Sequence, residues 1–126
     1  DLARGILRDG TEIGQMMKVV GEEGTSIEDF LIFLKGEYVD SVYLQQDAYN
    51  DIDAATSADR QKLVFGVITD ILKASMVFDD KETARRFFHQ LTQITKDWNR
   101  VDIEDPQFEE LKNRLVNMVS EVTANA

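Results

Sequence analysis

The chain has 126 residues, of which 43% are hydrophobic, and it contains no cysteine. This length fits one domain with a single core, and the lack of cysteine excludes a disulfide framework and suits a reducing compartment. The formal net charge of −10 argues against binding to nucleic acid or anionic lipid, and no apolar run is long enough to cross a bilayer.

An amphipathic helix is predicted at the start of the chain. Apolar residues recur at helical spacing from Leu2 to Val20, and the stretch 21–24 supplies glycines that can end a helix in the left-handed conformation. Gly10 and Gly14 weaken this helix, because glycine inside a helix costs backbone entropy. Asp1 stands within the helical pattern and is not methionine, so we expect a fragment of a longer protein.

A second amphipathic helix is predicted to follow. Thr25 and Glu28 form a capping-box pattern, and an apolar stripe then runs from Ile27 to Val42. Asp, Asn, Ala, Thr and Ser residues predict one longer polar loop over residues 47–58.

The third predicted helix begins under a cap at Thr56 or Ser57. Its apolar residues extend from Leu63 to Phe78 and cover more than one face. We therefore expect it to be the central and most buried helix.

Two more amphipathic helices complete the chain. Aspartates at 79–80 can cap a fourth helix whose apolar stripe covers residues 84–98. Asp105 and Pro106 fit the N-cap and first position of a fifth helix, with apolar residues over 108–122. Because no segment shows sustained alternation, the sequence predicts a single all-α domain over residues 1–126, a bundle of about five helices.

The sequence offers little for catalysis or metal binding. It lacks the G-x-x-x-x-G-K-[ST] pattern with which a phosphate-binding loop holds a nucleotide. His89 is the only histidine, with Arg85 one turn before it, and fits a partly buried structural residue better than a ligand. Asp47, Asp51 and Asp53 lack the glycine turn and distal glutamate of a calcium loop. We therefore predict neither catalytic nor metal-binding residues.

The end of the second helix carries a different kind of signal. Two glutamines, an alanine and an aromatic stand together there, within the segment Leu44, Gln45, Gln46, Asp47, Ala48 and Tyr49. A helix end followed by a polar turn accounts for Asp47 but does not require the rest. An adenine ring needs a small residue that lets it approach, an aromatic wall and amide groups near its edge. The segment is thus a candidate nucleotide contact.

This segment resembles one near the C-terminus of the catalytic A subunit of V-type (vacuolar/archaeal-type) rotary ATPases. That family shows a pattern close to F-L-Q-Q-N-A-F followed by V-D. The positions that coincide with it are Leu44, Gln45, Gln46, Ala48 and Asp53. Tyr49 replaces the usual phenylalanine, and Asp47 replaces the asparagine. The resemblance is best over residues 37–61.

The resemblance implies the C-terminal helical domain of a subunit that alternates with B subunits in a hexameric ring. ATP or ADP with magnesium would bind the parent assembly through a phosphate-binding loop N-terminal to this region. Ala48 and Tyr49 would wall the adenine side, with Leu44 and residues 45–47 supporting the turn. The fragment itself would hold no cofactor and hydrolyse no ATP.

The same resemblance implies how the domain works in the assembly. It would contact the central stalk subunits and couple ATP hydrolysis or synthesis to proton or sodium transport. Its location would be the cytoplasm, in the soluble sector that lies against the membrane without inserting into it. The alternative from another class is a stand-alone acidic helical-bundle adaptor that binds a basic partner.

Overall fold

The computed structural model describes residues 2–43 and 58–124. Within these residues the chain forms five α-helices and one short 3-10 helix, and the predicted all-α bundle is confirmed. The elements are α1 (Leu2–Val20), η1 (Glu22–Gly24), α2 (Ile27–Tyr43), α4 (Ala58–Lys73), α5 (Lys81–Asn99) and α6 (Pro106–Val122). The predicted loop over 47–58 lies outside the described residues, except for Ala58, which begins α4.

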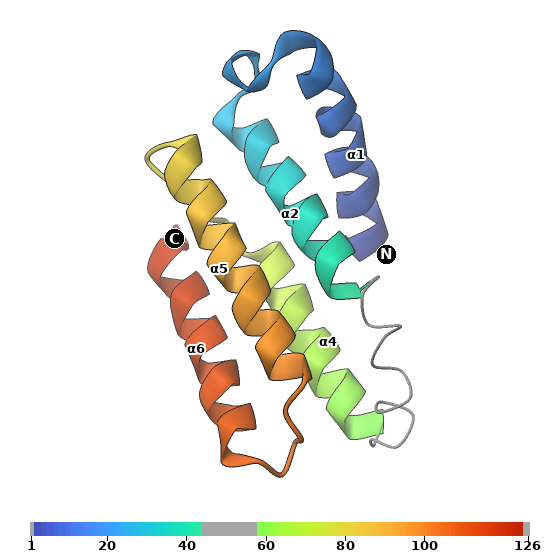
Figure 1. Ribbon diagram of the computed structural model, residues 1–126, viewed down its shortest axis with the longest axis vertical. Helices are drawn as coiled ribbons and strands as arrows, with labels where there is room; N and C mark the ends of the chain where they lie inside the picture. Colours follow the sequence, from blue (N-terminus) through green and yellow to red (C-terminus); the bar gives the residue numbers. More distant parts are fainter. Residues whose placement is uncertain (1, 44–57, 125–126) are drawn as a thin grey trace.

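The helices α1 and α2 form an antiparallel hairpin joined through η1 at the upper end of the molecule (Figure 1). Gly10 and Gly36 lie where the two helices cross, and a Cβ atom on Gly10 would stand only 3.1 Å from Gly36 Cα. Gly10 thus allows the backbones to approach closely, a role that the expectation of a weakened helix did not include.

The helix α5 lies between two others, packing on α2 along one side and on α6 along the other (Figure 1). Its buried residues are Ala84, Phe88, Leu91, Ile94, Thr95 and Trp98. The centroids of the Trp98 ring and of the Phe108 ring on α6 are 5.2 Å apart. The hydroxyls of Tyr38 and Thr95 are hydrogen-bonded at 3.0 Å, which satisfies two polar groups inside the core.

The prediction that the third helix would be the most buried is wrong. The helix α4 ends at Lys73, and Val77, which was assigned to it, is 63% exposed. The backbone N–H of Val77 instead donates to Val122 O at 2.8 Å, so residues 75–77 pair in extended form with the end of the chain's last helix. This tertiary pairing, which apolar periodicity does not report, overrides the local pattern.

A lysine from another helix caps the C-terminal end of α4. Lys35 on α2 donates its Nζ to Leu72 O at 3.0 Å and to Ala74 O at 2.9 Å. A cation is favourable there, because the last carbonyls of a helix lack intrahelical partners and carry partial negative charge. Burial lowers the pKa of Lys35.

The predicted caps of the last two helices are confirmed. The Asp80 carboxylate accepts the backbone N–H of Thr83 at 2.7 Å, and this bond holds the pKa of Asp80 below its usual range. The Asp105 carboxylate accepts the backbone N–H of Gln107 at 2.9 Å, with proline in the first turn. The N-terminal ends of α5 and α6 can therefore be predicted from local sequence alone.

The prediction that Thr25 caps the start of α2 is wrong, because Ser26 takes that role. The Ser26 hydroxyl, not that of Thr25, accepts a backbone N–H of the first turn, from Asp29 at 3.1 Å. The Thr25 hydroxyl donates to Gly21 O at 3.0 Å instead. Gly21 has a φ of 80°, as expected for a glycine that ends α1.

Candidate functional site

The six residues predicted to contact a nucleotide lie outside the described part of the chain. They are Leu44, Gln45, Gln46, Asp47, Ala48 and Tyr49. Asp51 and Asp53 lie outside it as well. The structure describes the helices on either side, α2 ending at Tyr43 and α4 beginning at Ala58. Val42, in the last turn of α2, is buried in the core.

A buried arginine anchors the start of α4. Arg60 is only 5% exposed, and its Nη2 donates to Asn99 O at 3.0 Å and to Val101 O at 2.8 Å. Its guanidinium also lies over the Phe108 ring, 5.5 Å from the centroid. The cation thereby neutralises carbonyls at the end of α5 and joins three helices. Sequence reasoning missed it, although a cation in the first turn of a helix opposes the macrodipole and signals a partner elsewhere.

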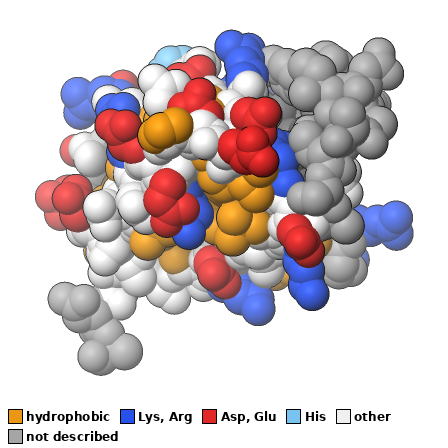
Figure 2. Space-filling model, turned by 90° about the horizontal axis from the view of Figure 1, so that it is seen from below, with side chains coloured by type: hydrophobic (Ala, Val, Ile, Leu, Met, Phe, Trp, Pro, Cys, Tyr) orange, Lys and Arg blue, Asp and Glu red, His pale blue; other side chains and the backbone are white. Residues whose placement is uncertain are grey.

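Figure 2 shows the end of the molecule that carries the start of α4 and the α5–α6 connection. Hydrophobic side chains gather near the middle of this face, and acidic and basic side chains surround them. Ile103, in the connection between α5 and α6, is 38% exposed. Apolar surface ringed by charges is typical of a contact with another domain or subunit.

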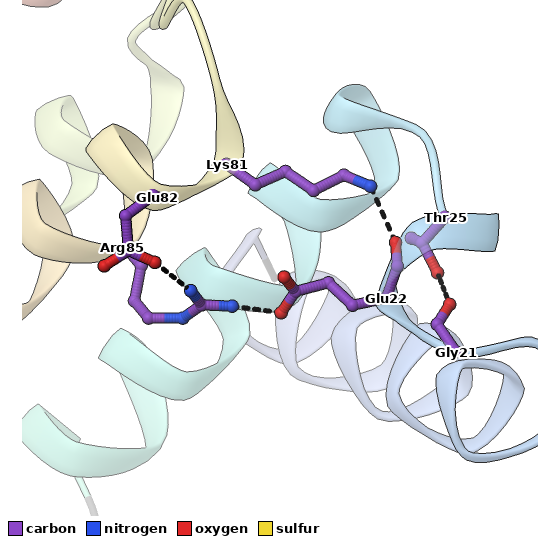
Figure 3. Close-up of polar contacts among 6 residues, drawn as sticks. All are labelled: Gly21, Glu22, Thr25, Lys81, Glu82 and Arg85. Carbon is purple, nitrogen blue, oxygen red and sulfur yellow. Dashed lines mark hydrogen bonds and ion pairs between the residues drawn. The ribbon is translucent and has the colours of Figure 1, made fainter.

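A charged cluster joins α5 to the turn between α1 and α2 (Figure 3). Arg85 forms ion pairs with Glu22 and with Glu82 one turn before it. Lys81 donates its Nζ to Glu22 O at 2.6 Å. The Arg85 guanidinium also lies 5.2 Å from the centroid of Phe30 on α2. The cluster fixes the upper end of the hairpin against the first turns of α5.

An open groove of about 610 Å³ runs along the hairpin between α1 and α2. Its lining is mainly apolar, with Leu7 and Met17 from α1 and Phe33 from α2. Glu37 and Asp40 of α2 line the same groove. The groove is larger than the hollows of about 280 Å³ and 450 Å³ elsewhere on the described surface.

Glu37 is the acidic residue of the groove whose ionisation the structure perturbs. Although its side chain reaches solvent, partial desolvation raises the pKa of Glu37; Arg85 acts in the opposite direction and Asp40 adds to the rise. Glu37 also lines the smaller hollow between α2 and α5. It therefore stands between the groove of the hairpin and the charged cluster of α5.

The expectation of a partly buried His89 is wrong. The imidazole is exposed on α5, where it lines the hollow of about 280 Å³ with Arg85 and Lys96. It lies on the opposite face from Phe88 and Leu91, which fill the core. In residues 2–43 and 58–124, no group of three or more His, Cys, Asp or Glu side chains could hold a metal ion.

The described helices do not include one that is both long enough and apolar enough to span a membrane.

Residues 2–83 match the family described as the C-terminal domain of V and A type ATP synthase. The V-type ATP synthase alpha chain of Borrelia garinii subsp. bavariensis is 47% identical over 120 residues, which cover 95% of this chain and 21% of that protein. That of Treponema denticola is 50% identical over 96 residues, or 76% of this chain and 16% of that protein. That of Borrelia turicatae is 44% identical over 117 residues, which cover 93% of this chain and 20% of that protein. No solved structure matches. The chain thus spans about a fifth of the length of the curated relatives it matches.

Proposed function

This chain belongs to the family of C-terminal domains of V- and A-type ATP synthases, and we propose that it serves as that domain in the catalytic A subunit of a rotary ATPase. The parent would hydrolyse or synthesise ATP and transport protons or sodium ions. The observation that carries the proposal is the 47% identity to a V-type alpha chain over 95% of these residues. The parent's coding sequence upstream of residue 1 should then encode a phosphate-binding loop. A parent that lacks this loop would favour the stand-alone acidic adaptor instead.

We propose that residues 1–126 form one helical domain and that Ala48 and Tyr49 wall the adenine side of the nucleotide pocket in the parent. Leu44, Gln45, Gln46 and Asp47 would support that turn. Two features of the adjoining helices support this role. The end of α2 is buried at Val42, and the start of α4 is anchored through Arg60. Both helices that lead to the segment are therefore fixed in the core.

Substitution of Tyr49 in the complete assembly tests the nucleotide contact. Stacking of a base on an aromatic ring contributes about 1–3 kcal/mol, so Tyr49→Ala should raise the KM for ATP about tenfold. Tyr49→Phe keeps the ring and serves as the control, with a KM within about twofold of wild type. Equal KM values for Tyr49→Ala and wild type would remove Tyr49 from the pocket.

We further propose that the end of α1 contacts the central stalk. Met16, Val19 and Val20 share one side of the helix end and are 59%, 86% and 54% exposed. They lie at the upper end of the hairpin, away from the end of α2 that leads to the nucleotide segment (Figure 1). Exposed apolar groups at the end opposite to the nucleotide segment suit a contact through which movement of the domain reaches the stalk.

A charge at the helix end tests this contact in the complete assembly. Val19→Asp should leave ATP hydrolysis measurable and lower the number of ions transported per ATP, because a buried carboxylate at an interface weakens it. Val116→Asp on α6 is the matched control, since Val116 is also exposed, at 47%. If the two variants couple hydrolysis to transport equally well, the end of α1 does not contact the stalk.

A further inference from the structure

The groove of the hairpin has the length and spacing of a helix-binding site. Leu7, Gly10, Gly14 and Met17 line it from α1, at steps of three and four residues over three helical turns. This run is about 15 Å long at 1.5 Å per residue. Peptide helices that bind in grooves present apolar side chains with the same spacing.

Three glycines, Gly10, Gly14 and Gly36, line the groove where α1 and α2 approach most closely. The Phe33 ring stands beside Gly14, where a Cβ would meet it at 3.1 Å. Met17 is flexible and can adapt to the shape of a partner side chain. The groove thus offers apolar surface into which large side chains of another helix can insert.

The two sides of the groove differ in charge. Asp40 is exposed on the α2 side and has no ion pair within the described residues. Glu37 lies one turn before it and is also exposed in the lining of the groove. Lys18 stands on the α1 side. A partner therefore gains most from cations along its α2-facing flank.

We infer that the groove between α1 and α2 binds an amphipathic helix of a protein partner, with leucine-like side chains over Gly10, Gly14 and Gly36 and Lys or Arg beside Glu37 and Asp40. This site is distinct from the α1 end proposed to contact the stalk and does not depend on nucleotide binding. It assigns a partner to the acidic side of the hairpin.

A synthetic peptide tests the site on the full 126-residue chain. The probe is a fluorescein-labelled 18-residue amphipathic helix of leucine and lysine, and its Kd is measured by anisotropy. A peptide with glutamate in place of lysine should bind at least about tenfold more weakly, because its charge opposes that of Asp40 and Glu37. Equal affinity for the two peptides would overturn the charge assignment.

Three variants locate the binding. Asp40→Lys should weaken binding of the leucine–lysine peptide about tenfold, and Gln15→Trp should do so by filling the groove. Glu121→Lys on α6 makes a similar charge change elsewhere on the surface and should change Kd by less than about twofold, because salt screens distant charges. Circular dichroism and the thermal midpoint confirm that each variant is folded. Equal weakening by Asp40→Lys and Glu121→Lys, or unchanged binding to Gln15→Trp, would overturn the site.

Discussion

The helices α1 and α5 have the same length, 19 residues, and both are amphipathic, yet the domain buries them very differently. Six residues of α5 are buried, including the aromatic side chains of Phe88 and Trp98. In α1 the one buried residue is Gly10. The reason is position, because α5 has α2 and α6 on either side whereas α1 packs mainly on α2 (Figure 1).

The difference shows that an amphipathic pattern predicts a covered face without saying what covers it. In α5 the cover is the rest of the domain. In α1 the apolar side chains of Met16 and Val19 remain exposed, and Leu7 and Met17 line an open groove. Apolar side chains left at a surface in this way mark contacts with partners, so α1 carries both interaction surfaces proposed above.

Truncating one apolar side chain on each helix gives the largest expected contrast. Phe88 on α5 is 3% exposed and contacts the rings of Tyr38, Phe78 and Phe87. Phe88→Ala should lower the free energy of unfolding by about 3–5 kcal/mol through the cavity it leaves. Val19→Ala should change it by less than about 0.5 kcal/mol. Urea unfolding of the isolated chain measures both values.

Similar losses in the two variants would mean that α1 is buried as deeply as α5, and the comparison would fail.

Glycine substitutions test how closely α1 must approach α2. A Cβ on Gly10 would lie 3.1 Å from Gly36 Cα and 3.3 Å from Ile32 O, and neither backbone atom can move aside alone. Gly10→Ala should therefore destabilise the chain by about 1–3 kcal/mol, despite the better helix propensity of alanine. Thermal and urea unfolding measure the change.

The control lies on the same helix. A Cβ on Gly5 would meet Arg8 Nη2 at 4.0 Å and nothing closer, so Gly5→Ala should stabilise by about 0.5–1 kcal/mol. If both substitutions stabilised the chain, α1 and α2 could move apart at Gly10 without a loss of stability.

Local sequence predicted those parts of the fold that neighbouring residues determine. The Asp80 and Asp105 caps and the core position of Phe88 depend on side chains within one or two turns. The end of α4 depends on Lys35, which is 37 residues from Leu72 in the chain. The close crossing at Gly10 and Gly36 likewise needs two segments that are distant in the chain. The sequence of the first helix alone therefore predicted that Gly10 weakens the helix, and it did not predict the contact with Gly36.

The candidate sites divide in the same way. The segment from Leu44 to Tyr49 was identified from its residue types and a family resemblance, and its role stays a prediction. The groove could not be predicted, because it arises where two helices meet through glycines. Arg85 was noticed only as a neighbour of His89. Its role became clear when Glu22 and Phe30 were found beside it.

The smallest expected effect concerns Glu37, which stands between the two compared regions. The pKa of Glu37 is raised in the folded chain. At pH values just above the ordinary pKa of glutamate, the folded state therefore holds more protons than the unfolded state. The stability this contributes is fully present below the ordinary pKa and is lost as the pH rises through the raised value. Glu37→Gln should remove this loss, measured as urea unfolding between pH 4 and 8.

A second substitution decides which neighbour governs Glu37. Arg85 opposes the rise in the pKa of Glu37, and Asp40 adds to it. In an Arg85→Gln background the loss of stability should therefore move to higher pH, and in an Asp40→Asn background to lower pH. If only Asp40→Asn shifts the pH dependence of the stability, the charges of the groove between α1 and α2 govern the pKa of Glu37. If only Arg85→Gln shifts this pH dependence, the charged cluster of α5 governs the pKa of Glu37, and Asp40 alone supplies the acidic side of the groove.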